Sequence, residues 1–162
     1  MIGNSIPMAG EIPRLQGRNV RKNEYVIDAL LKNKDIKAVL LVPATRSIFS
    51  LGEVYTKEDM DASPHFDEGL LGVSNAIELL EKAGKRVLLL VDHPGFPDPK
   101  SCISGGLTQS EFFNQFLYRK ENPLCIMTHE KHMHTNERYR LWLKTLQAKH
   151  PSLIVYDPTS LV

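Results

Sequence analysis

Three apolar runs, each followed at once by a polar loop, constrain the fold of this chain more than any other feature. They cover residues 38–42, 87–91 and 153–156. Continuous stretches of leucine and β-branched residues are typical of strands buried on both faces of a parallel sheet. In open α/β sheets, ligands bind just beyond the carboxyl ends of such strands. The polar residues that follow the three runs are therefore the first candidates for a functional site.

Apolar residues at helical spacing lie before and between these runs. Their pattern predicts helices over residues 23–34, 65–82 and 135–148, and Gly84 lies where a left-handed residue would end the second helix. Helices that alternate with strands predict a parallel sheet with helices on its faces. We therefore expect an α/β fold with a small parallel sheet. Three or four strands are few for a complete doubly wound domain.

The other segments predict less regular structure. Residues 1–20 hold prolines and glycines and are expected to be irregular. The polar residues 49–63 predict a loop over the sheet edge, and residues 94–107 predict a loop rich in proline, glycine and serine. Residues 111–119 are apolar enough for a helix, and residues 124–127 for a short strand or a buried turn. No repeat divides the sequence, so we assign the whole chain to one domain.

The composition excludes several classes of function. With 162 residues, 42% hydrophobic and 24% charged, the chain is typical of one globular domain with a core. Its net charge of +1 predicts no basic surface, so we expect no nucleic-acid partner. No apolar run approaches the roughly 20 residues that cross a membrane, and the first residues do not resemble a signal peptide. Cys102 and Cys125 are too few for a disulfide scaffold, and they either form one bridge or stay reduced.

The loop after the first strand provides the first group of candidate site residues. Thr45, Arg46 and Ser47 offer a guanidinium and two hydroxyls, which suit a carboxylate, a phosphate or a sugar. We predict that they bind substrate. The alternative is a surface arginine whose aliphatic stem covers the sheet edge.

The other two strands also end in polar residues. His93 follows Asp92 and is a further substrate-binding candidate, the alternative being a solvent-facing loop residue. Neighbouring side chains diverge in a strand, so the two residues do not form an orienting Asp–His pair. Asp157 follows the third strand, where it either caps the next turn or points into a cleft.

Three histidines, His129, His132 and His134, precede the last long helix. Their spacing would suit part of a metal site, but no cysteine or carboxylate completes the set at a familiar interval. We therefore predict no metal and no cofactor, and we interpret the three as solvated residues at a helix start. The sequence has no Walker loop, no G-x-G-x-x-G, no G-x-S-x-G elbow and no H-E-x-x-H.

The loops and strands together resemble the central part of the SGNH-hydrolase-like domain fused to acyltransferase-3 family membrane O-acetyltransferases of bacteria. The similarity covers roughly residues 23–162, and its pieces occur in the family's order. These pieces are residues 36–42 with Phe49 and Gly52 after them, residues 79–91 with a proline-rich loop and Cys102 after them, and residues 138–158.

This resemblance implies a three-layer α/β/α fold and a role in moving acyl groups, usually acetyl, onto hydroxyls of envelope polysaccharides such as lipopolysaccharide. It implies an acyl donor and a polysaccharide acceptor as partners, and a membrane acyltransferase domain in the full-length protein. It also implies a location on the periplasmic face of the inner membrane. In the family, a serine in a Gly-Asp-Ser loop attacks, a histidine in an Asp-x-x-His motif activates it, and Gly and Asn donors hold the oxyanion.

The chain departs from the family at its catalytic motifs. No Asp-x-x-His occurs, and Gly3-Asn4-Ser5 is the nearest match to Gly-Asp-Ser, which makes Ser5 the nucleophile candidate. Residues 44–47 stand where the family has its asparagine motif. We therefore expect a fragment or a degenerate copy that is inactive on its own.

Two other functions stay open. The first is a non-catalytic glycan- or partner-binding module on the same fold, which uses Arg46 and the 94–106 loop. The second is a small flavodoxin-like protein that binds a phosphorylated ligand. That function needs a glycine-rich cradle after a strand, and Gly105-Gly106 follows no predicted strand. A sheet cut at both sides exposes edges and apolar surface, which predicts marginal stability or self-association.

Overall fold

The structure is a computed structural model that describes residues 18–52, 54–92 and 125–161. Helices and strands alternate along most of these residues. In chain order the elements are α1 (Arg18–Lys32), β1 (Ala38–Leu41), α2 (Thr45–Phe49), α3 (Lys57–Ala62), α4 (Phe66–Lys82), β2 (Arg86–Leu90), α7 (His129–Thr135), α8 (Glu137–Lys149), β3 (Ile154–Tyr156) and the 3-10 helix η2 (Pro158–Leu161).

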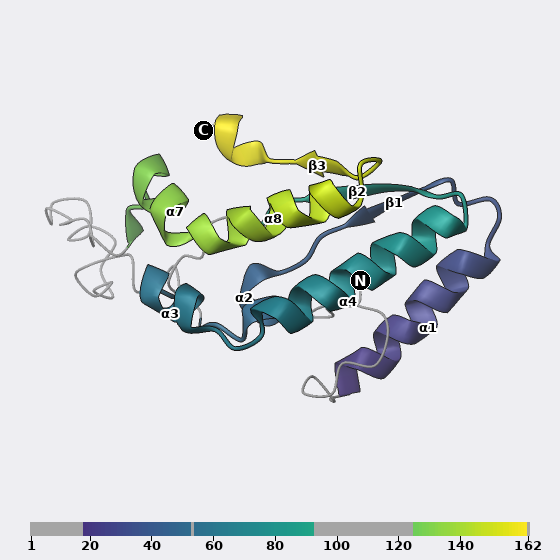
Figure 1. Ribbon diagram of the computed structural model, residues 1–162, viewed down its shortest axis with the longest axis horizontal. Helices are drawn as coiled ribbons and strands as arrows, with labels where there is room; N and C mark the ends of the chain where they lie inside the picture. Colours follow the sequence, from purple (N-terminus) through teal and green to yellow (C-terminus); the bar gives the residue numbers. More distant parts are fainter. Residues whose placement is uncertain (1–17, 53, 93–124, 162) are drawn as a thin grey trace, which may run out of the picture.

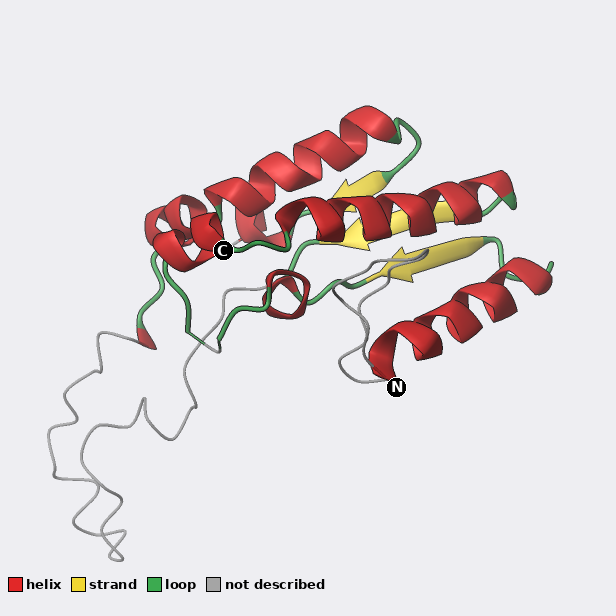
Figure 2. Ribbon diagram, turned by 60° about the horizontal axis from the view of Figure 1, so that its bottom comes forward, coloured by secondary structure: helices red, strands yellow, loops and turns green. Residues whose placement is uncertain are grey.

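The three strands form one parallel sheet in the order β1-β2-β3. Val39 lies opposite Val87, and Leu88 lies opposite Ile154. Because the order in the sheet follows the order in the chain, successive connections cross in one direction, which favours helices on a single face. Helices α1, α4 and α8 indeed lie side by side over one face of the sheet (Figures 1 and 2). The predicted parallel α/β arrangement is confirmed.

A hydrophobic core fills the space between the sheet and these helices. Alternate strand residues such as Val39, Val87 and Leu89 point into it and are buried. Helix α8 contributes Trp142, whose side chain is completely buried. A cluster of aromatic rings joins α2, α4 and α8, with neighbouring centroids 5.7 to 6.1 Å apart: Phe49, Phe66, Tyr139 and Trp142.

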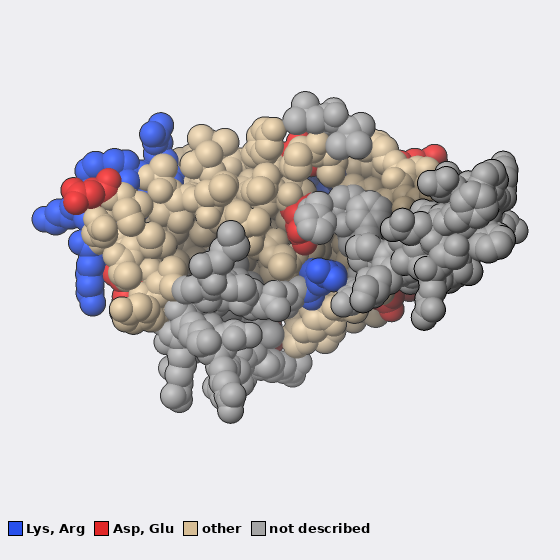
Figure 3. Space-filling model, turned by 180° about the vertical axis from the view of Figure 1, so that it is seen from behind, with Lys and Arg blue, Asp and Glu red and all other residues tan. Residues whose placement is uncertain are grey.

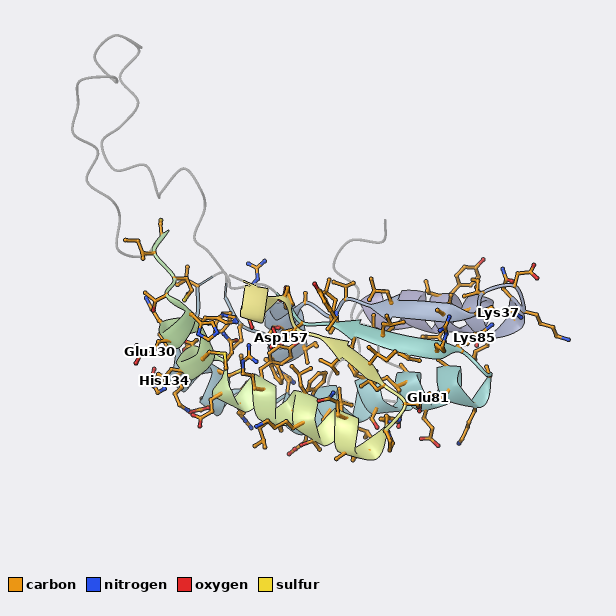
Figure 4. The ribbon with its side chains drawn as sticks, turned by 90° about the horizontal axis from the view of Figure 1, so that it is seen from above. Lys37, Glu81, Lys85, Glu130, His134 and Asp157 are labelled. Carbon is orange, nitrogen blue, oxygen red and sulfur yellow. The ribbon has the colours of Figure 1, made fainter. Side chains whose placement is uncertain are left out.

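The opposite face of the sheet is not covered by any helix of the described residues. Leu40, Val42, Ile154 and Tyr156 on this face are each 52 to 56% exposed. Figure 4 looks onto this face. The strands are therefore buried on one face rather than on both, and the second helical layer of a three-layer sandwich stays a prediction.

Helix α3 was not expected from the sequence. It lies within residues 49–63, where the polar composition predicted a loop. Its start is a capping box: the Asp59 N–H donates to Thr56 Oγ1 over 3.2 Å, and the Thr56 N–H donates to Asp59 Oδ2 over 2.9 Å. The two residues satisfy backbone groups that a short helix otherwise leaves unpaired, which explains how six residues form a helix here.

Other predicted boundaries differ by a few residues. Helix α1 begins at Arg18 rather than at residue 23, and a separate helix, α7, precedes α8. A short strand or a buried turn was predicted at residues 124–127, and the described part of this segment, residues 125–127, contains no strand. The predicted loop at residues 94–107 and the predicted helix at residues 111–119 lie outside the described residues.

The amino end of the sheet is fixed by the buried Lys85. Its Nζ donates to the backbone carbonyls of Asn33 and Ile36, over 2.5 and 2.8 Å, and so ties the start of β2 to the turn before β1. Seen from behind, lysine and arginine side chains gather at this end of the molecule (Figure 3). Lys37 and Lys85 are labelled there in Figure 4. The polar side chains discussed next lie at the opposite end.

Candidate functional site

Polar side chains from several elements meet beyond the carboxyl ends of the strands. Asp92 follows β2, and Asp157 follows β3 (Figure 4). His132, Asn136 and Arg140 come from α7, α8 and the junction between these helices. The charges of Asp92, Asp157 and Arg140 all act on the pKa of His132, so these groups share one electrostatic environment.

Asp92 joins the ends of two strands. Its Oδ2 accepts a hydrogen bond from the backbone N–H of Thr45 over 2.9 Å, which ties the end of β2 to the start of α2 after β1. A carboxylate is favoured beside the N–H groups that a helix start leaves unpaired. Burial, followed by the negative charge of Asp92, raises the pKa of Tyr55 to about 12. Tyr55 therefore stays a neutral hydroxyl at physiological pH.

Asp157 and Arg140 form the centre of a second hydrogen-bonded group. Arg140 Nη1 donates to Asp157 Oδ2 over 2.6 Å, and its Nη2 donates to Thr159 Oγ1 over 2.8 Å. Both the N–H and the hydroxyl of Thr159 donate to Asp157 Oδ1. Burial raises the pKa of Asp157, but the hydrogen bonds from Thr159 and Arg140 outweigh it and lower this pKa overall. Asp157 thus caps the turn that begins η2, one of the two roles expected from the sequence.

A third group runs along one helical stripe. His132, Asn136 and Arg140 are four residues apart, and backbone hydrogen bonds from Asn136 to His132 and from Arg140 to Asn136 continue across the α7–α8 junction. Residues at this spacing lie on the same side of a helix. The Tyr55 hydroxyl, from the segment before α3, donates to Asn136 Oδ1 over 2.7 Å.

The hydrogen bonds of Asn136 define the state of the His132 ring. The Asn136 amide nitrogen donates to the His132 carbonyl and lies 3.1 Å from His132 Nδ1. Because the amide nitrogen has only donors to offer, Nδ1 accepts, and the ring proton of a neutral His132 is on Nε2. Burial and the nearby Arg140 charge lower the pKa of His132, which favours this neutral form.

A cavity of about 310 Å³ opens beside this stripe. Tyr55, His132 and Asn136 are among the residues that line it. Val54 and Met127 add apolar surface, and the lining also includes three charged residues, Lys57, Glu58 and Lys131. An aromatic ring, an amide and an imidazole around one hollow can contact both the apolar and the hydroxyl-bearing faces of a small polar ligand.

Two buried hydroxyls lie beneath the site. The Thr45 and Tyr139 side chains are each 2% exposed, and neither hydroxyl makes a hydrogen bond of normal geometry within the described residues. Burial raises the pKa of Tyr139 to about 12, while nearby Thr45 opposes this rise. Asp92 and Tyr55 also act on the pKa of Tyr139, so this buried hydroxyl lies close to the site.

The structure brings only some of the predicted site residues to this place. Thr45 is there, with its backbone bound to Asp92, and Arg46 is half-buried close enough to act on the pKa of Tyr55. The Ser47 side chain, His93 and the nucleophile candidate Ser5 lie outside the described part of the chain. The substrate-binding role of all these residues stays a prediction.

The histidine prediction needs a correction. His129 and His134 are exposed, as expected, but His132 is 5% exposed and hydrogen-bonded, so it is not a solvated residue. It is buried because it faces the core side of α7, a helix that the sequence analysis did not separate from α8. Within the described ranges, no three residues of the types His, Cys, Asp and Glu are arranged to hold a metal ion.

Sequence reasoning missed Tyr55, Asn136 and Arg140. The four-residue spacing of His132, Asn136 and Arg140 was a visible signal of a shared helix face. No local signal indicates Tyr55, because it lies 81 residues from its partner Asn136.

Cys125 is disulfide-bonded in the structure. Cys102 is the only other cysteine of the chain and lies outside the described residues. The choice between a bridge and reduced thiols, which the sequence left open, is therefore resolved for Cys125 in favour of a bridge.

Comparisons with known proteins identify no relative: the chain matches no protein-family model, no curated protein and no solved structure. None of the helices described is both long and apolar enough to span a membrane.

Proposed function

We propose that this chain is part of an SGNH-hydrolase-like domain that takes part in transferring acetyl or other acyl groups to hydroxyls of bacterial envelope polysaccharides. Its carboxyl-end cavity would bind the acylated glycan. The observation that supports this best is the meeting of Tyr55, His132 and Asn136 around a cavity at the carboxyl end of a parallel sheet. Ligands of open α/β sheets bind at this end.

The chemistry of the cavity fits a sugar. Tyr55 offers a neutral hydroxyl and an aromatic ring, and His132 offers a neutral imidazole. These neutral donors and acceptors suit a polyhydroxylated ligand, and Lys57, Glu58 and Lys131 of the same lining add further hydrogen-bonding groups for hydroxyls.

The sheet supports the family proposal at a coarser level. A parallel sheet in the order β1-β2-β3 with helices on one face corresponds to two of the three layers of such a sandwich. The proposal includes a second helical layer on the other face. It also includes a membrane acyltransferase domain in the full-length protein, with an acyl donor and a polysaccharide acceptor as its substrates.

The disulfide at Cys125 supports a location on the periplasmic face of the inner membrane. Disulfides persist in oxidising compartments such as the periplasm and are rare in the bacterial cytosol.

A specific observation favours a second candidate, a non-catalytic glycan-binding module on the same fold. Within the described residues, the hydrogen bonds of the His132 ring go to Asn136 and not to a serine. An ester-cleaving site needs a nucleophile bonded to its base. Hydrolysis of p-nitrophenyl acetate that disappears in Ser5→Ala would identify Ser5 as that nucleophile, whereas binding without such hydrolysis would favour the module.

The proposed glycan site is tested by calorimetric titration with an O-acetylated oligosaccharide and with its form de-O-acetylated by mild alkali. We expect tighter binding of the acetylated form, and an about fivefold loss in Tyr55→Phe, the cost of one neutral hydrogen bond. Tyr25→Phe is the matched control, because Tyr25 on α1 is 77% exposed. Equal effects of the two variants, or no binding of either oligosaccharide, would overturn the proposal.

A further inference from the structure

We propose that Ser74, His150 and Glu81 form a second site, a serine-hydrolase triad that cleaves short acyl esters at the far ends of α4 and α8. This inference goes beyond the proposed function, because it concerns a different place in the molecule. Glu81 is labelled in Figure 4 well apart from Asp157 and His134, which belong to the carboxyl end of the sheet.

The sequence places the three residues together through two packed helices. Ser74 and Glu81 are seven residues apart on α4, close to two full helical turns, so they share one helix face. His150 follows directly after α8, and α8 packs against α4. The histidine therefore reaches the face of α4 that carries the serine and the carboxylate.

The distances are those of a nucleophile, a base and an orienting carboxylate. Ser74 Oγ lies 2.8 Å from His150 Nε2, and His150 Nδ1 lies 2.9 Å from Glu81 Oε2. Ser152 donates a further hydrogen bond to Glu81 Oε1 and holds the carboxylate in place. A base within hydrogen-bond reach of a hydroxyl, oriented by a third group, is the arrangement that activates a serine.

The hydrogen bonds also determine the tautomer of His150. An ionised Glu81 can only accept, so His150 Nδ1 carries the proton in their bond. Nε2 of a neutral ring is then an acceptor, and the Ser74 hydroxyl donates to it. The ring is thus prepared to take the proton of Ser74.

A cavity of about 550 Å³ gives access to the pair. Ser74 and His150 both line it, although they are only 8% and 7% exposed, as expected for groups at the base of a hollow. Lys149 lines the same cavity, as does the ion pair between Lys82 and Glu78. The positive charge of Lys149 favours the negatively charged oxygen of a tetrahedral intermediate.

The reaction follows from these positions. Ser74 Oγ bonds to the ester carbonyl carbon while its proton moves to His150 Nε2. The intermediate collapses, the bond to the alcohol oxygen breaks, and the alcohol leaves with the proton from His150. Water then attacks the acyl-Ser74 ester, His150 takes and returns its proton, and the carboxylic acid is released with Ser74 restored. A nucleophile this deeply buried selects a small acyl group such as acetyl.

The first test is labelling of the purified chain with a fluorophosphonate, followed by peptide mass spectrometry. We expect the label on Ser74 and a reduced yield in His150→Gln. A purely structural network between α4 and α8 would leave Ser74 unlabelled, and that result would overturn the proposal.

The second test is hydrolysis of p-nitrophenyl acetate. We expect the rate above buffer to fall at least tenfold in Ser74→Ala and less in Glu81→Gln, with the fold checked by circular dichroism. Alanine is a good helix former, so Ser74→Ala preserves α4. Ser50→Gly, at an exposed serine that follows the end of α2, is the control and should keep the parent rate. No activity, or activity lost in Ser5→Ala and kept in Ser74→Ala, would contradict the triad.

Discussion

At the scale of single residues, Gly84 and Ser50 show how backbone conformation limits sequence. Both have positive φ, 73° at Gly84 and 53° at Ser50. A Cβ added at Gly84 would meet no atom within 4 Å, so the cost of Gly84→Ala is conformational. We expect that change to lower the free energy of unfolding by about 1 kcal/mol, and Ser50→Gly to raise it by up to about 1 kcal/mol. Urea denaturation measures the free energy of unfolding of both variants. Changes of the same sign would contradict the positive-φ conformation of these two residues.

His132 and Asp157 make stability depend on pH. Both have lowered pKa values in the fold, from ordinary values of 6.5 and 3.8. The unfolded chain therefore binds protons more readily, so stability should fall as pH drops below 6.5 and again below 3.8. Urea denaturation at pH 7 and pH 5.5 measures the first step. This fall in stability between pH 7 and pH 5.5 should disappear in His132→Gln and remain in the control His129→Gln, which changes an exposed histidine. An equal fall in both variants would show that His132 is not its cause.

At the scale of elements, Arg138 of α8 holds the end of α3. Its Nη1 donates to the carbonyls of Met60 and Ser63, over 3.0 and 3.2 Å, and its guanidinium stacks 4.3 Å from the centre of the Phe66 ring. Arg138→Lys keeps the charge but loses the planar group. We expect a loss of about 1–2 kcal/mol in free energy of unfolding.

Hydrogen exchange locates this effect. Amides of α3 should exchange faster in Arg138→Lys. The protection of β2 amides should fall only by the change in the global free energy of unfolding. The matched control is Lys144→Arg on the exposed side of α8. This variant should leave the exchange rates of the α3 and β2 amides unchanged. Unchanged protection of α3 in Arg138→Lys would show that this helix does not depend on the arginine.

The elements differ in how well the sequence predicts them. Helix α4 has 17 residues, enough for its apolar stripe to appear as a period, and Gly84 marks its end. Helix α3 has six residues and buries only Met60, so periodicity cannot reveal it, and its signal is the Thr56–Asp59 capping box. The strands were predicted from composition, but composition does not tell whether one face or both are covered.

At the scale of the whole molecule, the exposed sheet face predicts self-association. Leu40, Val42 and Tyr156 form an apolar surface there, and β1 is an open edge among the described strands. We expect dimers or larger species in multi-angle light scattering at high protein concentration. Leu40→Glu should reduce them, while Leu141→Glu, equally exposed on α8, should not. A monomer that melts sharply well above about 60 °C would contradict this expectation.

The candidate site could be predicted only in part at this scale. The carboxyl end of the sheet was expected to hold it, and Asp92 and Asp157 lie there as their place after the strands implies. Tyr55 meets Asn136 only after the chain has folded, because 81 residues separate them. Long-range pairs of this kind leave no trace in local spacing, so the cavity itself was not predictable.

The most direct test of the account is an NMR titration of the isotope-labelled chain with an O-acetylated oligosaccharide. We predict that amide shifts concentrate at Tyr55, His132, Asn136 and their neighbours at the carboxyl end of the sheet. Shifts confined to the ends of α4 and α8, or no shifts at saturating ligand, would contradict a glycan site at the carboxyl end.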